Sequence, residues 1–192
     1  MYPLLLFSLV SAAVILEKAA GKKYEEVLKQ YLTDTLHLEN TVVDNPYSTI
    51  KKRSNFYMPN VIEQIVNAPF TDLRMNAASK GLLSNAEDLV KLGNALLYSN
   101  YFSKEIREKV FQPVKLYDNA EARMANAWII FKDKQGRKVY GKEDMTVTGG
   151  SAGILIYPEE GLVVAFASNV SQSVGATPIF KIAEAFLSEK SE

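Results

Sequence analysis

The last third of the chain contains two short apolar runs joined by a polar turn, and this pattern constrains the fold more than any other. The runs occupy residues 154–157 and 162–167, and the turn between them reads Pro-Glu-Glu-Gly. Apolar runs of this length on either side of a Pro- and Gly-containing turn predict a β-hairpin. Gly149 and Gly150 precede the hairpin, where glycine permits a bend and the close approach of a ligand or of a packed helix. The sequence therefore predicts an antiparallel hairpin entered through a glycine bend.

The spacing of apolar residues predicts the other elements. Helical spacing predicts four helices, over residues 22–36, 85–97, 103–112 and 178–187. Ser84 with Glu87 is typical of a capping box at the start of the second helix. Two further strands are predicted over residues 127–131 and 137–140. Helices followed by an antiparallel sheet and a closing helix make an α+β chain.

Composition excludes several classes of function. The 22 basic and 22 acidic residues cancel, so no net charge attracts nucleic acid or an anionic membrane. The chain has no cysteine, so it has no disulfide and no thiol nucleophile, and we expect neither a metal nor another cofactor. The single histidine, His37, lies just past a predicted helix. We expect a structural role for it, which leaves no Ser-His-Asp triad.

Residues 2–16 carry no charge, a feature shared by signal peptides and membrane spans. The segment lacks a basic region before it and a clear small-residue cleavage site, and it is short for a transmembrane helix. We therefore expect no membrane span, and the cellular location stays open.

Three short motifs occur in the order used by enzymes with an active-site serine and a nearby lysine. They are Ser48-Thr49-Ile50-Lys51, Tyr98-Ser99-Asn100 and Thr148-Gly149-Gly150. A nucleophilic serine needs a helix start in the core with its lysine one turn further on, but Ser48 and Lys51 lie in a polar, turn-like segment. Tyr98 follows apolar residues at helical spacing, which predicts a helix end. We therefore interpret Ser48, Lys51 and Tyr98 as non-catalytic.

The third motif and its surroundings resemble a known family. Thr148-Gly149-Gly150, the Pro-Glu-Glu-Gly turn and a strand ending in Asn169 are similar to the C-terminal sheet of the serine beta-lactamase and penicillin-binding-protein superfamily, in its class C, esterase-like branch. The segment 81–97 resembles the family's Gly-Leu-x-Ser-Thr-Ala-x-Asp-Leu helix start, and residues 12–24 resemble its helix–Gly–Lys–x–Tyr connection. The resemblance extends over about residues 7–187.

The resemblance implies a partial beta-lactamase/transpeptidase-like fold. Residues 1–115 would form the remainder of the helical subdomain, with a buried helix over 9–18, and residues 116–192 would form the C-terminal sheet and its covering helix. The family's Ser-x-x-Lys and Tyr-x-Asn motifs would both fall before Met1. The sheet face that packs on the nucleophile helix would then be exposed and would favour self-association, along Trp128, Ile130, Leu155 and Ile156 or the residues that alternate with them.

The resemblance also implies a chemistry, the hydrolysis of an amide or ester through an acyl-enzyme. Thr148, Gly149 and Gly150 would line the substrate, and the N–H of Gly150 would donate to the oxyanion at the edge of an open cleft. Val147 stands where the family usually has Lys or His.

Without the family's serine, its lysine and the tyrosine, we expect no turnover by this chain alone. Three interpretations follow: a hydrolase fragment, a non-catalytic binding or assembly module, or one half of a split enzyme. In the last case a small-molecule or peptide substrate would bind only when another chain supplies the N-terminal half.

Overall fold

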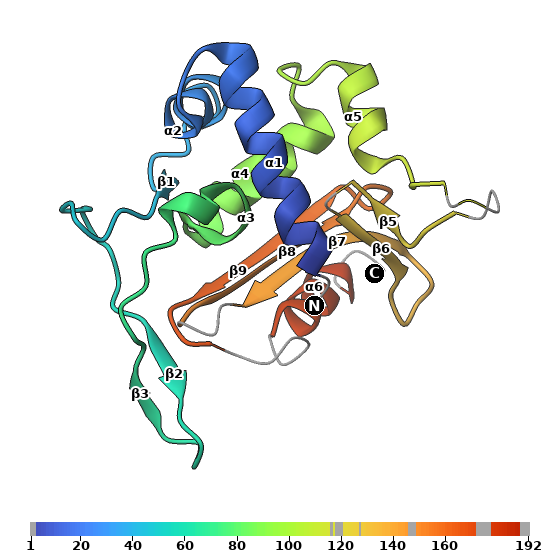
Figure 1. The fold of residues 1–192 in the computed structure, drawn as a ribbon. Helices are drawn as coiled ribbons and strands as arrows, with labels where there is room; N and C mark the ends of the chain where they lie inside the picture. The colour runs from blue at the N-terminus through green and yellow to red at the C-terminus, as the bar shows by residue number, and fades with distance from the viewer. Residues whose placement is uncertain are drawn as a thin grey trace.

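A computed structural model describes residues 3–115, 117, 121–126, 128–145, 149–171 and 178–188. Its largest element is a five-stranded antiparallel sheet in which each strand pairs with the next along the chain (Figure 1). The strands are β5 (Met124–Ala125), β6 (Trp128–Lys132), β7 (Lys138–Met145), β8 (Ser151–Tyr157) and β9 (Leu162–Ser168). β8 and β9 form the hairpin predicted from the two apolar runs, with Tyr157 opposite Leu162.

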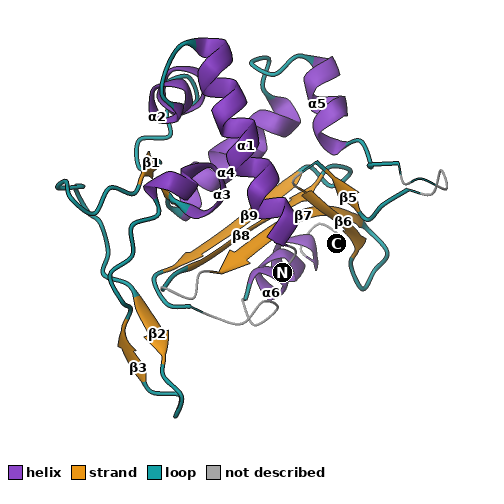
Figure 2. Ribbon diagram, viewed as in Figure 1, coloured by secondary structure: helices purple, strands orange, loops and turns teal. Residues whose placement is uncertain are grey.

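Helices precede and follow the sheet (Figure 2). Those before it are α1 (Pro3–Ala20), α2 (Tyr24–Leu28), the π-helical η1 (Lys29–Thr33), the 3-10 turn η2 (Arg74–Asn76), α3 (Ala77–Lys80), α4 (Ala86–Tyr98) and α5 (Lys104–Phe111). The last helix is α6 (Ile179–Ser188). Two small ladders pair β1 (Val42–Val43) with β4 (Leu82–Leu83) and β2 (Tyr57–Pro59) with β3 (Ile65–Asn67). This arrangement confirms the α+β class.

One face of the sheet is closed by α6. The buried residues of this helix recur every fourth position, which places them on one stripe. They are Ile179, Ala183 and Leu187, and they pack on Val139, Leu155, Tyr157 and Val164. The covering C-terminal helix predicted from the sequence is confirmed.

The opposite face is covered by α4 and α5. Leu96 of α4 lies in a second core with Ala125, Tyr140, Ile154 and Ile156 of the sheet, and Phe111 of α5 packs against it. A Cβ on Gly93 of α4 would lie 2.5 Å from a methyl carbon of Val163, so glycine at this position lets the helix lie directly on β9.

The exposure predicted for Trp128, Ile130, Leu155 and Ile156 is therefore wrong. Leu155 and Ile156 are only 3% and 0% exposed, because α6 covers one of them and α4 with α5 covers the other. Trp128 and Ile130 are half-buried and pack against the second core. The alternate residue Ile129 of β6 is 46% exposed, and further apolar side chains are exposed on α1 and other elements.

The helix expected over residues 9–18 forms as part of α1, but it is not buried. Val14, Ile15 and Leu16 are 56%, 69% and 42% exposed. In Figure 1, α1 runs along the outside of the helical layer, where it contacts α2 and α3. Among the described residues, no helix combines the length and the apolar character needed to cross a membrane.

Candidate functional site

The predicted glycine bend lies between β7 and β8. Gly149 and Gly150 both have a φ of 93°, a left-handed conformation that residues with a Cβ rarely adopt. Gly149 is buried, and a Cβ there would lie 2.5 Å from the Cβ of Phe56 and 3.0 Å from the backbone nitrogen of Tyr57. The element that approaches the glycine is therefore the chain's own Phe56–Tyr57 segment, neither a helix nor an open cleft.

Two serine hydroxyls hold the bend and the start of β8 to the segment after β9, and a third orders that segment. The N–H of Gly149 donates to Oγ of Ser171 at 3.0 Å, and the hydroxyl of Ser151 donates to the carbonyl of Val170 at 2.9 Å. Oγ of Ser168 accepts from the N–H of Val170 at 3.1 Å. Because the first two bonds join Gly149 and the first residue of β8 to the segment just after β9, they close the open end of the hairpin around the bend.

The base of the β2–β3 hairpin extends this pairing. Tyr57 donates its N–H to the carbonyl of Asn169 at 2.9 Å and accepts from the N–H of Ser171 at 3.0 Å. These bonds make a parallel bridge between Tyr57 and Val170. The side-chain amide of Asn169 donates to the carbonyl of Asn55 at 2.9 Å. The hairpin base is therefore fastened to the main sheet beside the bend.

An ion pair supports the aromatic ring that covers the bend. The guanidinium carbon of Arg53 lies 5.2 Å from the centre of the Phe56 ring. The same guanidinium donates to both carboxylate oxygens of buried Asp44, at 2.8 and 2.9 Å. Hydrogen bonding to Asp44 raises the pKa of Arg53, so the guanidinium stays charged. The ring is thus held between a bidentate ion pair and the glycine bend.

Ser48 and Lys51 lie in the exposed connection between β1 and β2. The N–H and the hydroxyl of Ser48 donate to the carbonyl of Asn45 at 3.2 and 3.3 Å. Lys51 is exposed in the following turn and shares no helix with Ser48. The segment from Ser48 to Lys51 therefore forms turns, as the sequence predicts.

Tyr98 is the last residue of α4, as its helical spacing predicts. It is 61% exposed, and its hydroxyl lies directly over the backbone of Gly161 in the β8–β9 turn. Thr148, the first residue of the third motif, lies outside the described residues, as does Val147. Of the predicted site residues, the described structure therefore brings Gly149 and Gly150 together and leaves Ser48 and Lys51 on another loop.

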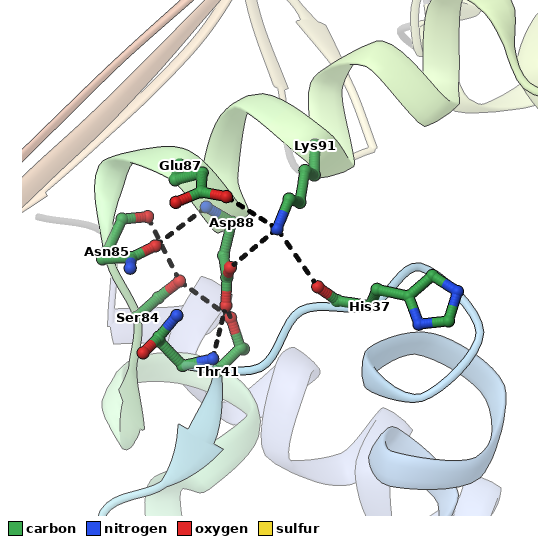
Figure 3. A network of polar contacts seen from close by, with 8 residues as sticks. His37, Thr41, Ser84, Asn85, Glu87, Asp88 and Lys91 are labelled. Carbon is green, nitrogen blue, oxygen red and sulfur yellow. Dashed lines mark hydrogen bonds and ion pairs between the residues drawn. The ribbon is translucent and has the colours of Figure 1, made fainter. Parts of the chain in front are cut away.

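Sequence reasoning missed a polar network at the start of α4, drawn in Figure 3. Asp88 is 1% exposed, and its Oδ2 accepts from the N–H of Asn40 at 2.8 Å and from the hydroxyl of Thr41 at 2.9 Å. The Thr41 hydroxyl also lies 2.8 Å from that of Ser84. These bonds fasten the loop before β1 to the helix that covers the sheet.

The first turn of α4 corrects the predicted capping box. The N-cap is Asn85, whose Oδ1 accepts from the N–H of Asp88 at 2.8 Å, and Ser84 lies one residue before it. Glu87 pairs with Lys91 at 2.8 Å and does not return to the cap. The physical reason is that an asparagine already accepts the helix-start N–H, so the serine is free to bond the neighbouring loop.

Lys91 completes the network from the next turn of α4. Its Nζ lies 3.9 Å from Oδ1 of Asp88 and donates to the carbonyl of His37 at 3.4 Å. His37 is exposed and has a φ of 53°, so it contributes through its backbone at a turn. We assign the network to stability, because its bonds join α4 to the segment between His37 and Thr41.

A comparison with protein-family models matches residues 8–185 to the beta-lactamase family. The chain is 28% identical to the bovine and human mitochondrial proteins called serine beta-lactamase-like protein LACTB, with 97% of this chain aligned to each. It spans 40% of the length of the bovine relative and 41% of the human one.

Solved structures share the fold at lower identity. A penicillin-binding protein from Bacillus halodurans has a TM-score of 0.72 and 16% identity, over 91% of this chain and 52% of the other. A D-stereospecific amidohydrolase from Streptomyces sp. has a TM-score of 0.71 and 19% identity, over 86% of this chain and 49% of the other. This likeness shows a shared fold, of which the chain corresponds to about half.

Proposed function

This chain belongs to the beta-lactamase family, and from that premise we propose that it forms the oxyanion-binding side of a serine hydrolase whose nucleophile lies outside these residues. The proposed reaction is hydrolysis of an amide or ester through an acyl-enzyme. Thr148, Gly149 and Gly150 are the residues assigned to it.

The proposal rests on one observation: hydrogen bonds hold the glycine bend in place on both sides. Gly149 is tied to Ser171, and Ser151 is tied to Val170, so both sides of the bend are fixed to the end of β9. An oxyanion donor is effective when it is held in place before the charge develops, because no reorganisation is then needed in the transition state. Gly150 follows directly on this held bend, and its N–H is therefore suited to donate to the oxyanion.

The remaining groups would come from a Ser-x-x-Lys segment on the other half of the fold. Its serine would attack the carbonyl carbon while the lysine accepts the hydroxyl proton, and the oxyanion would receive N–H bonds from that serine and from Gly150. Water would then release the acyl group. Loss of a single oxyanion donor costs about 3 kcal/mol in the barrier, so loss of the nucleophile and its base abolishes turnover.

Three observations support placing the nucleophile outside this chain. Ser48 and Lys51 are exposed in turns, where no helix aligns them. The relatives with the same fold are about twice as long as the part that this chain matches. The chain's exposed apolar side of α1, at Val14 and Ile15, is a surface that further chain of this fold would cover.

The test is hydrolysis of a chromogenic cephalosporin and of a p-nitrophenyl ester by the purified chain. We expect no product from the chain alone. We expect product when it is mixed with the N-terminal half of a family member that carries Ser-x-x-Lys, and none when that serine is replaced by alanine. Formation of a stable but inactive mixture would favour the alternative function, a non-catalytic binding or assembly module.

Ser48→Ala tests the excluded nucleophile directly. We expect it to behave as the unmodified chain in both assays, and Thr49→Ala in the same exposed turn is its matched control. A burst of product from the unmodified chain that disappears in Ser48→Ala, but not in Thr49→Ala, would overturn the proposal.

A further inference from the structure

The β2–β3 hairpin has two edges that differ in what they offer to another strand. Its register places Tyr57 opposite Asn67 and Pro59 opposite Ile65. The N–H of Ala68 donates to the carbonyl of Phe56, which makes the alternate pair Met58 and Val66 face inward. The backbone groups of Tyr57, Pro59, Ile65 and Asn67 therefore face outward.

The β2 edge is closed. Tyr57 already exchanges hydrogen bonds with Asn169 and Ser171, and Pro59 has no N–H to donate. Proline at an outward position is a device by which edge strands avoid pairing. The β2 edge therefore cannot accept another strand along its length.

The β3 edge is open. In the described residues the two-stranded sheet ends at β3, and the outward N–H and C=O groups of Ile65 and Asn67 meet no further strand. No proline or charged residue interrupts β3. This contrast between the two edges of one hairpin points to pairing at β3.

The side chains of the hairpin are unusually apolar for an exposed element. Glu63 is the one charged residue in residues 54–70. The exposed fractions of the apolar side chains are 101% for Val61, 68% for Ile62, 59% for Ile65 and 38% for Val66. The hairpin extends beyond the helices and the main sheet (Figure 2). A lone two-stranded hairpin is marginally stable in water, so a third strand on β3 would add the stability that it lacks.

We propose that β3 pairs antiparallel with β3 of a second copy of this chain, forming a continuous four-stranded sheet across a two-fold axis. The axis passes beside Val66, so that Val66 of each copy lies opposite its equivalent and Ile65 lies opposite Asn67. Ile65 and Asn67 then exchange both of their outward hydrogen bonds, in the pattern of an antiparallel ladder.

A second copy is the occupant that the geometry favours, because this register is complementary to itself. In this register Gln64 of one copy lies opposite Ala68 of the other, and Glu63 lies opposite Pro69. No like charges therefore face each other. The two Val66 side chains form a non-hydrogen-bonded pair, in which side chains approach most closely. An isologous contact of this kind closes as a dimer. Its small size predicts weak, concentration-dependent association.

Single cysteines test the register, because the chain has none of its own. Two Cys side chains at position 66 would lie within the Cα separation that a disulfide requires. We expect Val66→Cys to form a covalent dimer on mild oxidation at protein concentrations where the unmodified chain dimerises. Val61→Cys is the control: it is fully exposed, but lies in the turn beyond the paired residues Asn60 and Gln64, so its equivalent is more than about 13 Å away across the axis.

Opposite charges at position 66 test the two-fold pairing without cross-linking. Val66→Lys and Val66→Glu should each be monomeric by sedimentation, and an equal mixture of them should recover the dimer. Val61→Lys mixed with Val61→Glu should dimerise like the unmodified chain. Circular dichroism and thermal unfolding establish that each variant is folded.

Two results would overturn the proposal. One is a folded chain that remains monomeric at every concentration, with Val66→Cys cross-linking no faster than Val61→Cys. The other is a dimer that survives both charged substitutions at position 66, because its interface would then lie on another surface.

Discussion

The N–H of Gly149 donates a 3.0 Å hydrogen bond to Oγ of Ser171, a residue 22 positions further along the chain. Because Ser171 in turn donates its N–H to the carbonyl of Tyr57, one serine joins the glycine bend to the base of the β2–β3 hairpin. The bend, the end of β9 and the hairpin base therefore form one unit. A substitution in any one of these three segments should therefore also change the local stability of the other two.

Replacing Gly149 with alanine should destabilise the chain. The new Cβ meets Phe56 and Ala68, and the left-handed φ is itself costly for any residue with a Cβ. We expect a loss of about 3 kcal/mol in the free energy of unfolding, measured by denaturant titration. Hydrogen exchange should show faster opening at Tyr57.

Gly136→Ala separates the two contributions. Gly136 also has a positive φ, of 82°, but a Cβ there would meet nothing within 4 Å. This variant should lose only the part of the unfolding free energy that comes from the positive φ, about 1 kcal/mol, and hydrogen exchange at Tyr57 should be unchanged. Equal losses in the two variants would mean that Phe56 does not pack on the bend.

Tyr98→Phe should have little effect. The ring stays on Gly161 at the end of α4, and the side chain is largely exposed. We expect the free energy of unfolding to change by less than about 1 kcal/mol, and ligand binding by the chain or by its mixture with an N-terminal half to be unchanged. If binding were lost while the fold stayed intact, Tyr98 would belong to the site.

Asp88→Ala should be the most destabilising change in the helical part. It removes a buried acceptor, so the N–H of Asn40 loses its bond to the carboxylate and the hydroxyl of Thr41 keeps only its contact with Ser84. We expect a loss of about 3 kcal/mol in thermal or denaturant unfolding, since bonds to charged groups are strong. Glu87→Ala removes the exposed neighbour that pairs with Lys91, and should change stability far less.

The stability contributed by Asp133 should disappear in acid. Burial alone would raise the pKa of this carboxyl, but hydrogen bonds from the Arg137 side chain and from the N–H groups of Arg137 and Gln135 lower it below the ordinary value of 3.8. A lowered pKa in the folded state stabilises the fold above the unfolded-state pKa, and this stabilisation is lost as pH falls through the folded-state value.

Asp133→Asn provides the measurement. The difference in unfolding free energy between this variant and the unmodified chain should be constant near neutral pH. It should shrink as the pH falls below 3.8, because the protonated carboxyl then resembles the amide. A difference that stays constant down to strong acid would show that the Arg137 pair does not depend on ionised Asp133.

The elements read most reliably from the sequence are those with local signals. The β8–β9 hairpin follows from two apolar runs and a Pro-Gly turn, and α6 follows from apolar residues at helical spacing. The end of α4 at Tyr98 and the turn at Ser48 follow from the same kind of local pattern. Local chemistry also specified the glycine bend, since few residues besides glycine adopt its backbone conformation.

Burial was predicted less well than secondary structure. The sequence marks 154–157 as apolar, but α4, α5 and α6, which cover the two faces of the sheet, come from segments far away in the chain. The uncharged stretch in α1 is a clear helix signal, yet whether Val14 and Ile15 are covered depends on neighbours that no local pattern specifies.

The α+β class, the hairpin and the family can be read from the amino-acid sequence, because they rest on local propensity and on short segments such as Thr148-Gly149-Gly150 and the Pro-Glu-Glu-Gly turn. The segment that approaches Gly149 and the burial of Asp88 as an acceptor follow only from the three-dimensional packing. Each of these depends on contacts between residues distant in sequence, such as Ser171 with Gly149 or Thr41 with Asp88. Their energies arise from the packing of the whole chain and have no local signature.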